Sequence, residues 1–171
     1  MLNFFKKEEL GQAIGLDVGA SSVKVVQLRK EKNRIVLDTY GEVALGPYGG
    51  LKIGQGVHLG EEKLVEAVQD LFKEAKVTAR DAVIAIDPTA AFVSLVNVPK
   101  VSDDELRTMM PIEARKYIPI PLTEVQMDWW HIPQTVKFIN DEKMISVVLA
   151  AVNNSALTSS AAISQKLELK N

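Results

Sequence analysis

The sequence contains no cysteine and only two histidines, His58 and His131, among its 171 residues. Without cysteine there is no disulfide framework, no thiol nucleophile and no thiolate metal site, a composition that fits a reducing cytoplasm. Two histidines far apart in the sequence also make a zinc site a poor expectation. His58 has no acid or serine at a triad-like spacing, so nothing in the sequence supports nucleophilic catalysis.

An excess of positive charge is also absent. The 20 basic and 22 acidic side chains give a formal net charge of −2, which provides no broad positive field for a phosphate backbone. No apolar run reaches the roughly 18 residues that suggest a membrane-spanning helix. We therefore expect neither a nucleic-acid partner nor a transmembrane segment. With 47% hydrophobic and 25% charged residues, the composition is that of a globular chain.

The first half of the sequence predicts three strands, a helix and a fourth strand, at 13–18, 23–28, 34–43, 61–76 and 82–86. Short polar turns separate the first three strands, which indicates an antiparallel meander. The residues from Gly46 to Gly60 are rich in glycine and predict a loop. The fourth strand is almost entirely apolar and ends at Asp87-Pro88, so we expect it to be buried on both faces and to join the same sheet.

The second half predicts a strand, a helix, two strands and a last helix, at 92–98, 102–118, 125–132, 144–152 and 156–169. Ser102 and Glu105 form a capping box, and the acids beside them are explained by the helix start. Pro111 predicts a kink in this helix. A polar turn at Asn140-Asp141 joins the two strands, and the adjacent Trp129 and Trp130 should face opposite sides of the first of them.

The two element series meet near Pro88 to Ala91. Two small α/β units in series, residues 1–90 and 91–171, explain this order better than one unit does.

The turn after the first strand carries the residues best suited to bind a ligand. Gly19, Ser21 and Ser22 can present backbone amides and hydroxyls to a phosphate. Asp17 can hold Mg²⁺ through water, and Lys24 adds a positive charge. The glycine spacing and the strand that follows exclude a Walker A loop and a dinucleotide fingerprint. A turn in which Asp17 and Gly19 serve backbone geometry alone explains the same residues.

Three stretches carry a family resemblance: the hairpin from Ile14 to Lys24, the start Asn3-Phe4-Phe5-Lys6-Lys7, and Glu113-Ala114-Arg115-Lys116-Tyr117-Ile118-Pro119-Ile120-Pro121. Together they resemble the PilM family, actin-like cytoplasmic proteins of type IV pilus assembly that are related to FtsA. The resemblance covers most of residues 1 to about 152. Pro111 and the Ser/Ala-rich end from Asn153 depart from the family pattern.

The resemblance implies an α/β, actin-like (ribonuclease-H-like) subdomain at 1–90 and an inserted small α+β module of the SHS2 type, strand-helix-strand-strand-helix, at 91–171. The second actin-like lobe, which supplies the other half of a nucleotide cleft, is expected to be absent from this chain. The phosphate turn would then be the first phosphate motif of an ATP and Mg²⁺ site, with affinity in the millimolar range or undetectable and no hydrolysis.

The resemblance also implies a cytoplasmic scaffold that binds the N-terminal tail of PilN, an inner-membrane protein, and that associates with that membrane through its partners. The residues assigned to this contact are Phe92, Val93, Leu95, Tyr117 and Ile118. Two alternative functions remain open at this point: an ATPase or sugar-kinase-type enzyme completed by a partner chain, and an inactive truncated remnant. Whether the chain self-associates is also open.

Overall fold

The computed structural model describes residues 11–133, 137–139 and 142–170. The stretch Asn3-Phe4-Phe5-Lys6-Lys7 and the turn at Asn140-Asp141 lie outside these residues. The described chain forms two compact units. Of the described residues, the first unit comprises 11–87 and 157–170, and the second lies within Pro88–Ala156.

The first unit contains a four-stranded sheet with the order β3-β2-β1-β4. β1 pairs with β2, and β2 with β3, in the antiparallel sense, while β4 runs parallel to β1. The predicted meander and the addition of the fourth strand to it are therefore confirmed. The strands are β1 Gln12–Val18, β2 Ser22–Glu31, β3 Arg34–Ala44 and β4 Ala82–Ala85.

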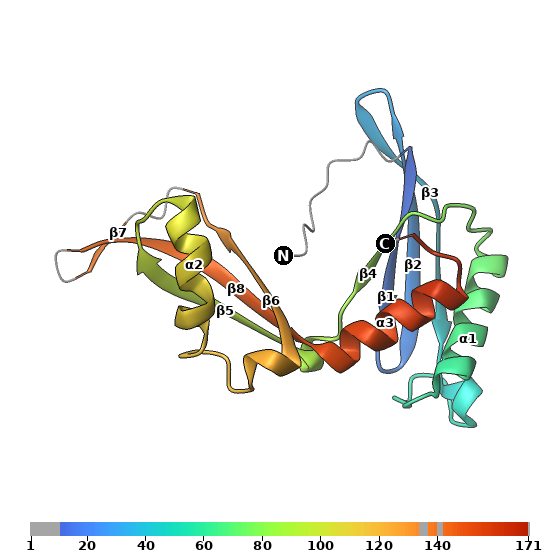
Figure 1. The fold of residues 1–171 in the computed structure, drawn as a ribbon. Coiled ribbons are helices and arrows are strands. Elements are labelled where there is room, and N and C mark those ends of the chain that lie inside the picture. The colour runs from blue at the N-terminus through green and yellow to red at the C-terminus, as the bar shows by residue number, and fades with distance from the viewer. Residues whose placement is uncertain (1–10, 134–136, 140–141, 171) are drawn as a thin grey trace. The chain divides into compact units, whose positions relative to one another are not determined.

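Two helices cover one face of this sheet (Figure 1). They are α1, Glu61–Glu74, and the later part of α3, Asn154–Lys166. Between β3 and α1 lies a short 3-10 turn, η1, at Gly46–Gly49. The core is built from apolar residues that alternate along β1 and β2 and recur at helical spacing in α1: Ile14, Leu16, Val23, Val25, Val65, Val68 and Leu71.

The prediction that β4 is buried on both faces is wrong. Its residues alternate between partly buried and exposed, and the side chain of Val83 is 69% exposed. Within the described residues, α1 and α3 cover only the face to which Ala82 and Ile84 point. An apolar run therefore indicated a strand correctly but gave no information about a second covering layer.

The assignment of the last residues differs from the predicted one. The sequence placed 91–171 in a single module, whereas residues from Leu157 onward belong to the first unit. Ile163, Leu167 and Leu169 pack into the core of the first sheet. The backbone of Lys170 also pairs with the strand edge, because Ala82 donates its N–H to the Lys170 carbonyl at 2.8 Å.

The second unit contains the sheet β5-β8-β6, all antiparallel, with β7 paired to β8. α2 covers one face of it (Figure 1). The predicted strand-helix-strand-strand order is confirmed, with β7 as a short addition that the sequence did not predict. The elements are β5 Ala91–Pro99, α2 Asp103–Ala114, η3 Leu122–Glu124, β6 Val125–His131, β7 Lys137–Ile139 and β8 Glu142–Asn153; a second 3-10 turn, η2, at Pro88–Ala90 precedes them. No helix within the described residues is long and apolar enough to cross a membrane.

The start of α2 is the predicted capping box. The Glu105 amide donates to the Ser102 hydroxyl oxygen at 3.4 Å, and the Ser102 amide donates to the Glu105 carboxylate at 3.0 Å. Hydrogen bonds from the Ser102 side chain and backbone lower the pKa of Glu105. Pro111 lies inside the helix, which ends at Ala114.

Replacing Ser102 by alanine should lower the free energy of unfolding by about 1 kcal/mol, and Ser102→Gly by only a few tenths of that. The lowered pKa of Glu105 means that the box stabilises the fold above the ordinary pKa of a glutamate and loses this contribution as the pH falls. Urea titrations at neutral and acidic pH should therefore show a smaller difference between Ser102→Ala and wild type in acid. An equal difference at both pH values would contradict this assignment.

Candidate functional site

The predicted phosphate turn joins β1 to β2. The Gly19 amide donates to the Ser22 carbonyl at 3.0 Å, and Asp17 lies opposite Lys24 in the strand pairing. A Cβ added to Gly19 would lie 3.2 Å from the Ser22 carbonyl oxygen, so the tightness of the turn favours glycine. The Leu45 amide donates a hydrogen bond to the Ser21 carbonyl oxygen at 2.9 Å. The structure thus brings together all the residues predicted for this turn.

The charge of Lys24 is already balanced within the chain. Its ammonium nitrogen lies 3.6 Å from a Glu42 carboxylate oxygen on β3 and donates to the Ser22 hydroxyl at 3.1 Å. A hydrogen bond from Ser22, and secondly the charge of Lys24, lower the pKa of Glu42. With Asp17 on the same face, the turn carries two carboxylates and one ammonium. This balance weighs against an incoming phosphate.

The turn also has too few carboxylates to bind a metal ion tightly. Within the described part of the chain there is no group of three or more acidic, histidine or cysteine side chains that could hold one. Asp17 is exposed and would supply one carboxylate, which suits only a magnesium ion that keeps most of its waters. The turn therefore fits a weak, water-mediated Mg²⁺ contact better than a tight nucleotide site.

Replacing Glu42 by glutamine should increase affinity for Mg²⁺-ATP by roughly tenfold, because Lys24 would then be free to make a charge-assisted contact with a phosphate oxygen. Wild-type affinity should be no better than about millimolar. Calorimetric titration measures both values. Glu31→Gln, at the exposed far end of β2, serves as the control and should change nothing. Micromolar binding by the wild type, or equal heats for Glu42→Gln and wild type, would refute this reading of the turn.

The residues predicted for partner binding do not form one surface. Val93 and Leu95 are 64% and 58% exposed and lie on the same face of β5. Phe92 alternates to the opposite face and packs against the core under α2. Ile118 is a core residue, 6% exposed, and Tyr117 is partly exposed beyond the end of α2. Only Val93 and Leu95 are therefore placed together at an accessible surface.

A row of apolar side chains crosses the sheet at this place. Leu95 pairs with Val148, and Val148 with Trp130, so the three stand side by side on the face away from α2. Trp130 is 49% exposed, whereas Trp129 packs against the core, which confirms that the two tryptophans face opposite sides. We call Val93, Leu95, Trp130 and Val148 the outer apolar face.

β5 also lies at the end of its sheet. Its backbone pairs with β8 on one side, and no other described strand pairs with it. An unpaired strand edge offers a row of backbone donors and acceptors to a further strand. The outer apolar face and this edge adjoin, because Val93 and Leu95 belong to β5.

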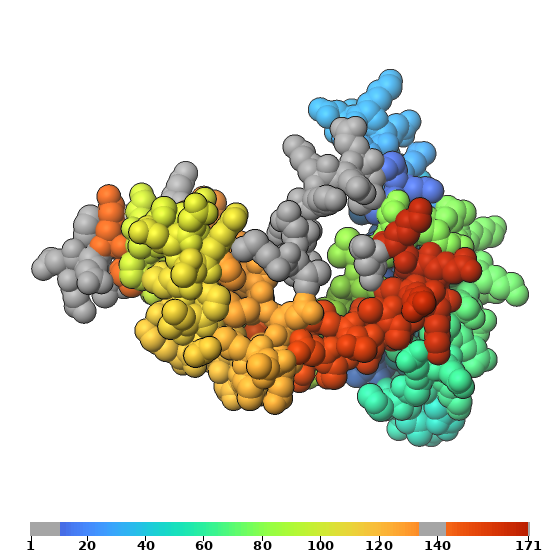
Figure 2. Space-filling view, in the orientation of Figure 1, coloured from blue at the N-terminus to red at the C-terminus, as the bar shows by residue number. Residues whose placement is uncertain are grey.

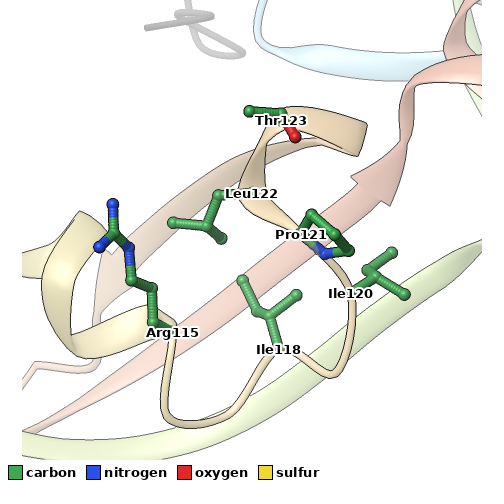
Figure 3. A pocket seen from close by; sticks show the side chains of 6 residues that line it. All are labelled: Arg115, Ile118, Ile120, Pro121, Leu122 and Thr123. Carbon is green, nitrogen blue, oxygen red and sulfur yellow. The ribbon is translucent and has the colours of Figure 1, made fainter.

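A hollow of about 340 Å³ lies beyond the end of α2 (Figure 3). Arg115, at the end of the helix, borders it, and Ile118 and Leu122 point into it. Figure 2 shows the segment after α2, in yellow and orange, at the surface of the second unit. Sequence reasoning identified this segment by its prolines but did not predict a hollow. The lining residues are Arg115, Ile118, Ile120, Pro121, Leu122 and Thr123.

The family model described as "Type IV pilus assembly protein PilM" matches residues 15–171. The structure is similar to that of a "PilM-PilN type IV pilus biogenesis complex", with a TM-score of 0.74 and 25% identity over 95% of this chain and 46% of that one. It is also similar to the cytoplasmic domain of EpsL, an inner membrane component of the type II secretion system of Vibrio cholerae. There the TM-score is 0.57 and the identity 13%, over 93% of this chain and 55% of that one.

The chain thus spans about half the length of the solved chains that it matches. The likeness to EpsL shows the fold alone. The matches confirm the predicted fold class, an actin-like α/β subdomain with an inserted small module.

Proposed function

Because this chain belongs to the PilM family of type IV pilus assembly proteins, we propose that it binds the N-terminal cytoplasmic tail of a PilN-like inner-membrane protein at the edge of β5. The tail would lie extended along this edge, and it would hold the chain at the cytoplasmic side of the membrane. This role is that of a scaffold, which requires binding and no turnover of substrate.

The proposal rests on one observation: the unpaired edge of β5 adjoins the outer apolar face. β5 is nine residues long and paired on one side only within the described chain. Two of its side chains, Val93 and Leu95, are more than half exposed although both are apolar. A contiguous exposed apolar patch on a soluble protein is one of the features that mark an interaction site.

An added strand would use both features. Its backbone amides and carbonyls would pair with those of β5, which gives affinity without depending on sequence. Every second side chain of the added strand would stand beside Val93 and Leu95, the exposed apolar side chains that β5 carries on the face away from α2.

The similarity to a solved complex supports the identity of the partner. The matched structure is described as a complex of PilM with PilN, and the match covers 95% of this chain. A PilN-like tail is therefore the first ligand to test.

The direct test is a titration of a fluorescently labelled PilN-like N-terminal peptide with the 171-residue chain, followed by anisotropy. We expect saturable binding that a scrambled peptide of the same composition does not reproduce. The absence of binding at peptide concentrations up to about millimolar, which corresponds to about 4 kcal/mol, would rule out the proposed function.

A further inference from the structure

We propose that α2 forms an interface with α2 of a second copy of this chain, in an antiparallel and two-fold symmetric arrangement. The interface goes beyond the proposed function, because it uses the face of the second unit that carries α2 and not the outer apolar face. It rests on a stripe of exposed residues that is complementary to itself: Asp104, Thr108, Ile112 and Arg115.

These four residues share one side of the helix. Steps of four, four and three residues keep side chains on one face, since an α-helix has 3.6 residues per turn. Ile112 is 63% exposed. A groove of about 530 Å³ runs beside it, lined by Asp104, Glu105, Thr108, Met109 and Ile112. The helix therefore presents an apolar middle in a shallow groove, although its opposite face is already buried against the sheet.

The two ends of the stripe carry opposite charges, a carboxylate in the first turn of α2 and a guanidinium just after its last turn. Among the described residues neither the Asp104 carboxylate nor the Arg115 guanidinium belongs to an ion pair. The neighbouring Lys116 is different, because it pairs with Glu113 at 2.8 Å, an interaction that raises the pKa of Lys116. Asp104 and Arg115 are thus the two charges within the stripe that a second copy can pair with.

An antiparallel pairing satisfies both charges at once. Asp104 of one copy lies opposite the partner's Arg115, and Arg115 lies opposite the partner's Asp104, with Thr108 and Ile112 meeting between them. A two-fold axis near the middle of α2 produces both contacts, as isologous interfaces require. The antiparallel arrangement also favours the helix dipoles, because the positive amino end of each helix lies beside the negative carboxyl end of the other.

The contact should be weak. Two helices of 12 residues each make a small interface beside the roughly 1,200–2,000 Å² of stable complexes. We therefore expect a dimer that forms at concentrations on the order of 100 µM, where sedimentation equilibrium can follow it.

Charge reversal tests the pairing. Asp104→Arg and Arg115→Asp should each weaken dimerisation by at least roughly tenfold, because each places like charges opposite at both ends of the interface. The double variant Asp104→Arg/Arg115→Asp should restore dimerisation to within about threefold of wild type, because both ion pairs are re-formed with reversed polarity. Asp103→Arg and Arg107→Asp change the same charges on the same helix but outside the stripe, and should have no effect.

A mixing experiment tests whether the contact joins two molecules as described. A solution of the Asp104→Arg variant with the Arg115→Asp variant should contain heterodimers, since each end then pairs an arginine with an aspartate. Circular dichroism of every variant verifies that it is folded, and the PilN-like peptide should bind all of them as it binds wild type. Unchanged peptide binding by these variants would show that the α2 interface can fail without loss of the proposed function.

Three results would overturn the proposal: a monomeric wild type up to millimolar concentration, no recovery in the double variant and the mixture, or equal weakening by Asp103→Arg. If Asp104 and Arg115 prove important only for capture of a different protein, the wild type will be monomeric and the pairing of two copies is refuted.

Discussion

Replacing Val93 and Leu95 together by glutamine is expected to weaken binding of the PilN-like peptide by at least about 100-fold. Each apolar side chain that becomes buried on binding contributes on the order of 1.5–3 kcal/mol, and glutamine loses most of that gain. Both side chains are more than half exposed, so the folded chain should tolerate the change. Anisotropy titration measures the loss, and a thermal melt verifies the fold.

The chain offers a matched control on its other sheet. Ile35 and Leu37 are 69% and 53% exposed, are also two residues apart, and lie on β3, another strand at the end of a sheet. Ile35→Gln with Leu37→Gln should leave peptide binding unchanged. If this pair weakens binding as much as the β5 pair does, the peptide is held by general apolar contact and not by β5.

Replacing Gln27 by methionine should lower the free energy of unfolding of the first unit by about 2–4 kcal/mol. Gln27 is 4% exposed, and its carbonyl oxygen accepts the amides of Thr78 and Ala79 at 2.8 and 3.0 Å. Its side-chain nitrogen donates to the Thr78 hydroxyl at 3.1 Å. Methionine fills a similar volume but accepts no strong hydrogen bond, so the buried Ala79 amide would be left unpaired, at a cost of about 1–3 kcal/mol.

Gln12→Met, at an exposed position of β1 in the same sheet, is the comparison and should change stability by less than about 0.5 kcal/mol. Urea unfolding followed by circular dichroism measures both variants. Equal stabilities of Gln27→Met and wild type would mean that the bonds between Gln27 and the loop after α1 contribute nothing.

The order of elements could be predicted because each has a local signature. The apolar alternation along β1 and β2 and the helical spacing in α1 each reflect one face that is buried in the core. The capping box of α2 reflects the need of the first helical amides for hydrogen-bond acceptors. The last helix was placed in the wrong unit for the opposite reason. Nothing local in Asn154–Lys166 says which of two cores will receive Ile163.

Glu42 is the residue at the β1–β2 turn that sequence reasoning missed. Counting back from the β2–β3 turn, Lys24 would meet Gly41, since Glu31 pairs with Arg34 and Leu28 with Leu37. An irregularity between Gln27 and Leu28 shifts the register by one residue and brings Glu42 opposite Lys24 instead. A bulge of this kind depends on packing across the whole sheet, so the turn looked more cationic in the sequence than it is.

The prediction of partner-binding residues did not allow for the alternation of side chains between the two faces of a strand. The resemblance implies a contact that includes Phe92, Val93 and Leu95, but successive strand residues point to opposite faces. Phe92 therefore belongs to the core of the second unit, while the neighbour that does complete the outer apolar face, Trp130, comes from β6. Which strands adjoin is set by the β5-β8-β6 order, which no local pattern reveals.

Amide hydrogen exchange in the presence of the PilN-like peptide tests most directly whether β5 receives a strand. A paired edge exchanges more slowly, so amides within Ala91–Pro99 should slow by at least about tenfold at saturating peptide, while those of β3 should not change. Unchanged exchange along β5 in a sample where anisotropy proves the peptide to be bound would contradict strand addition at this edge.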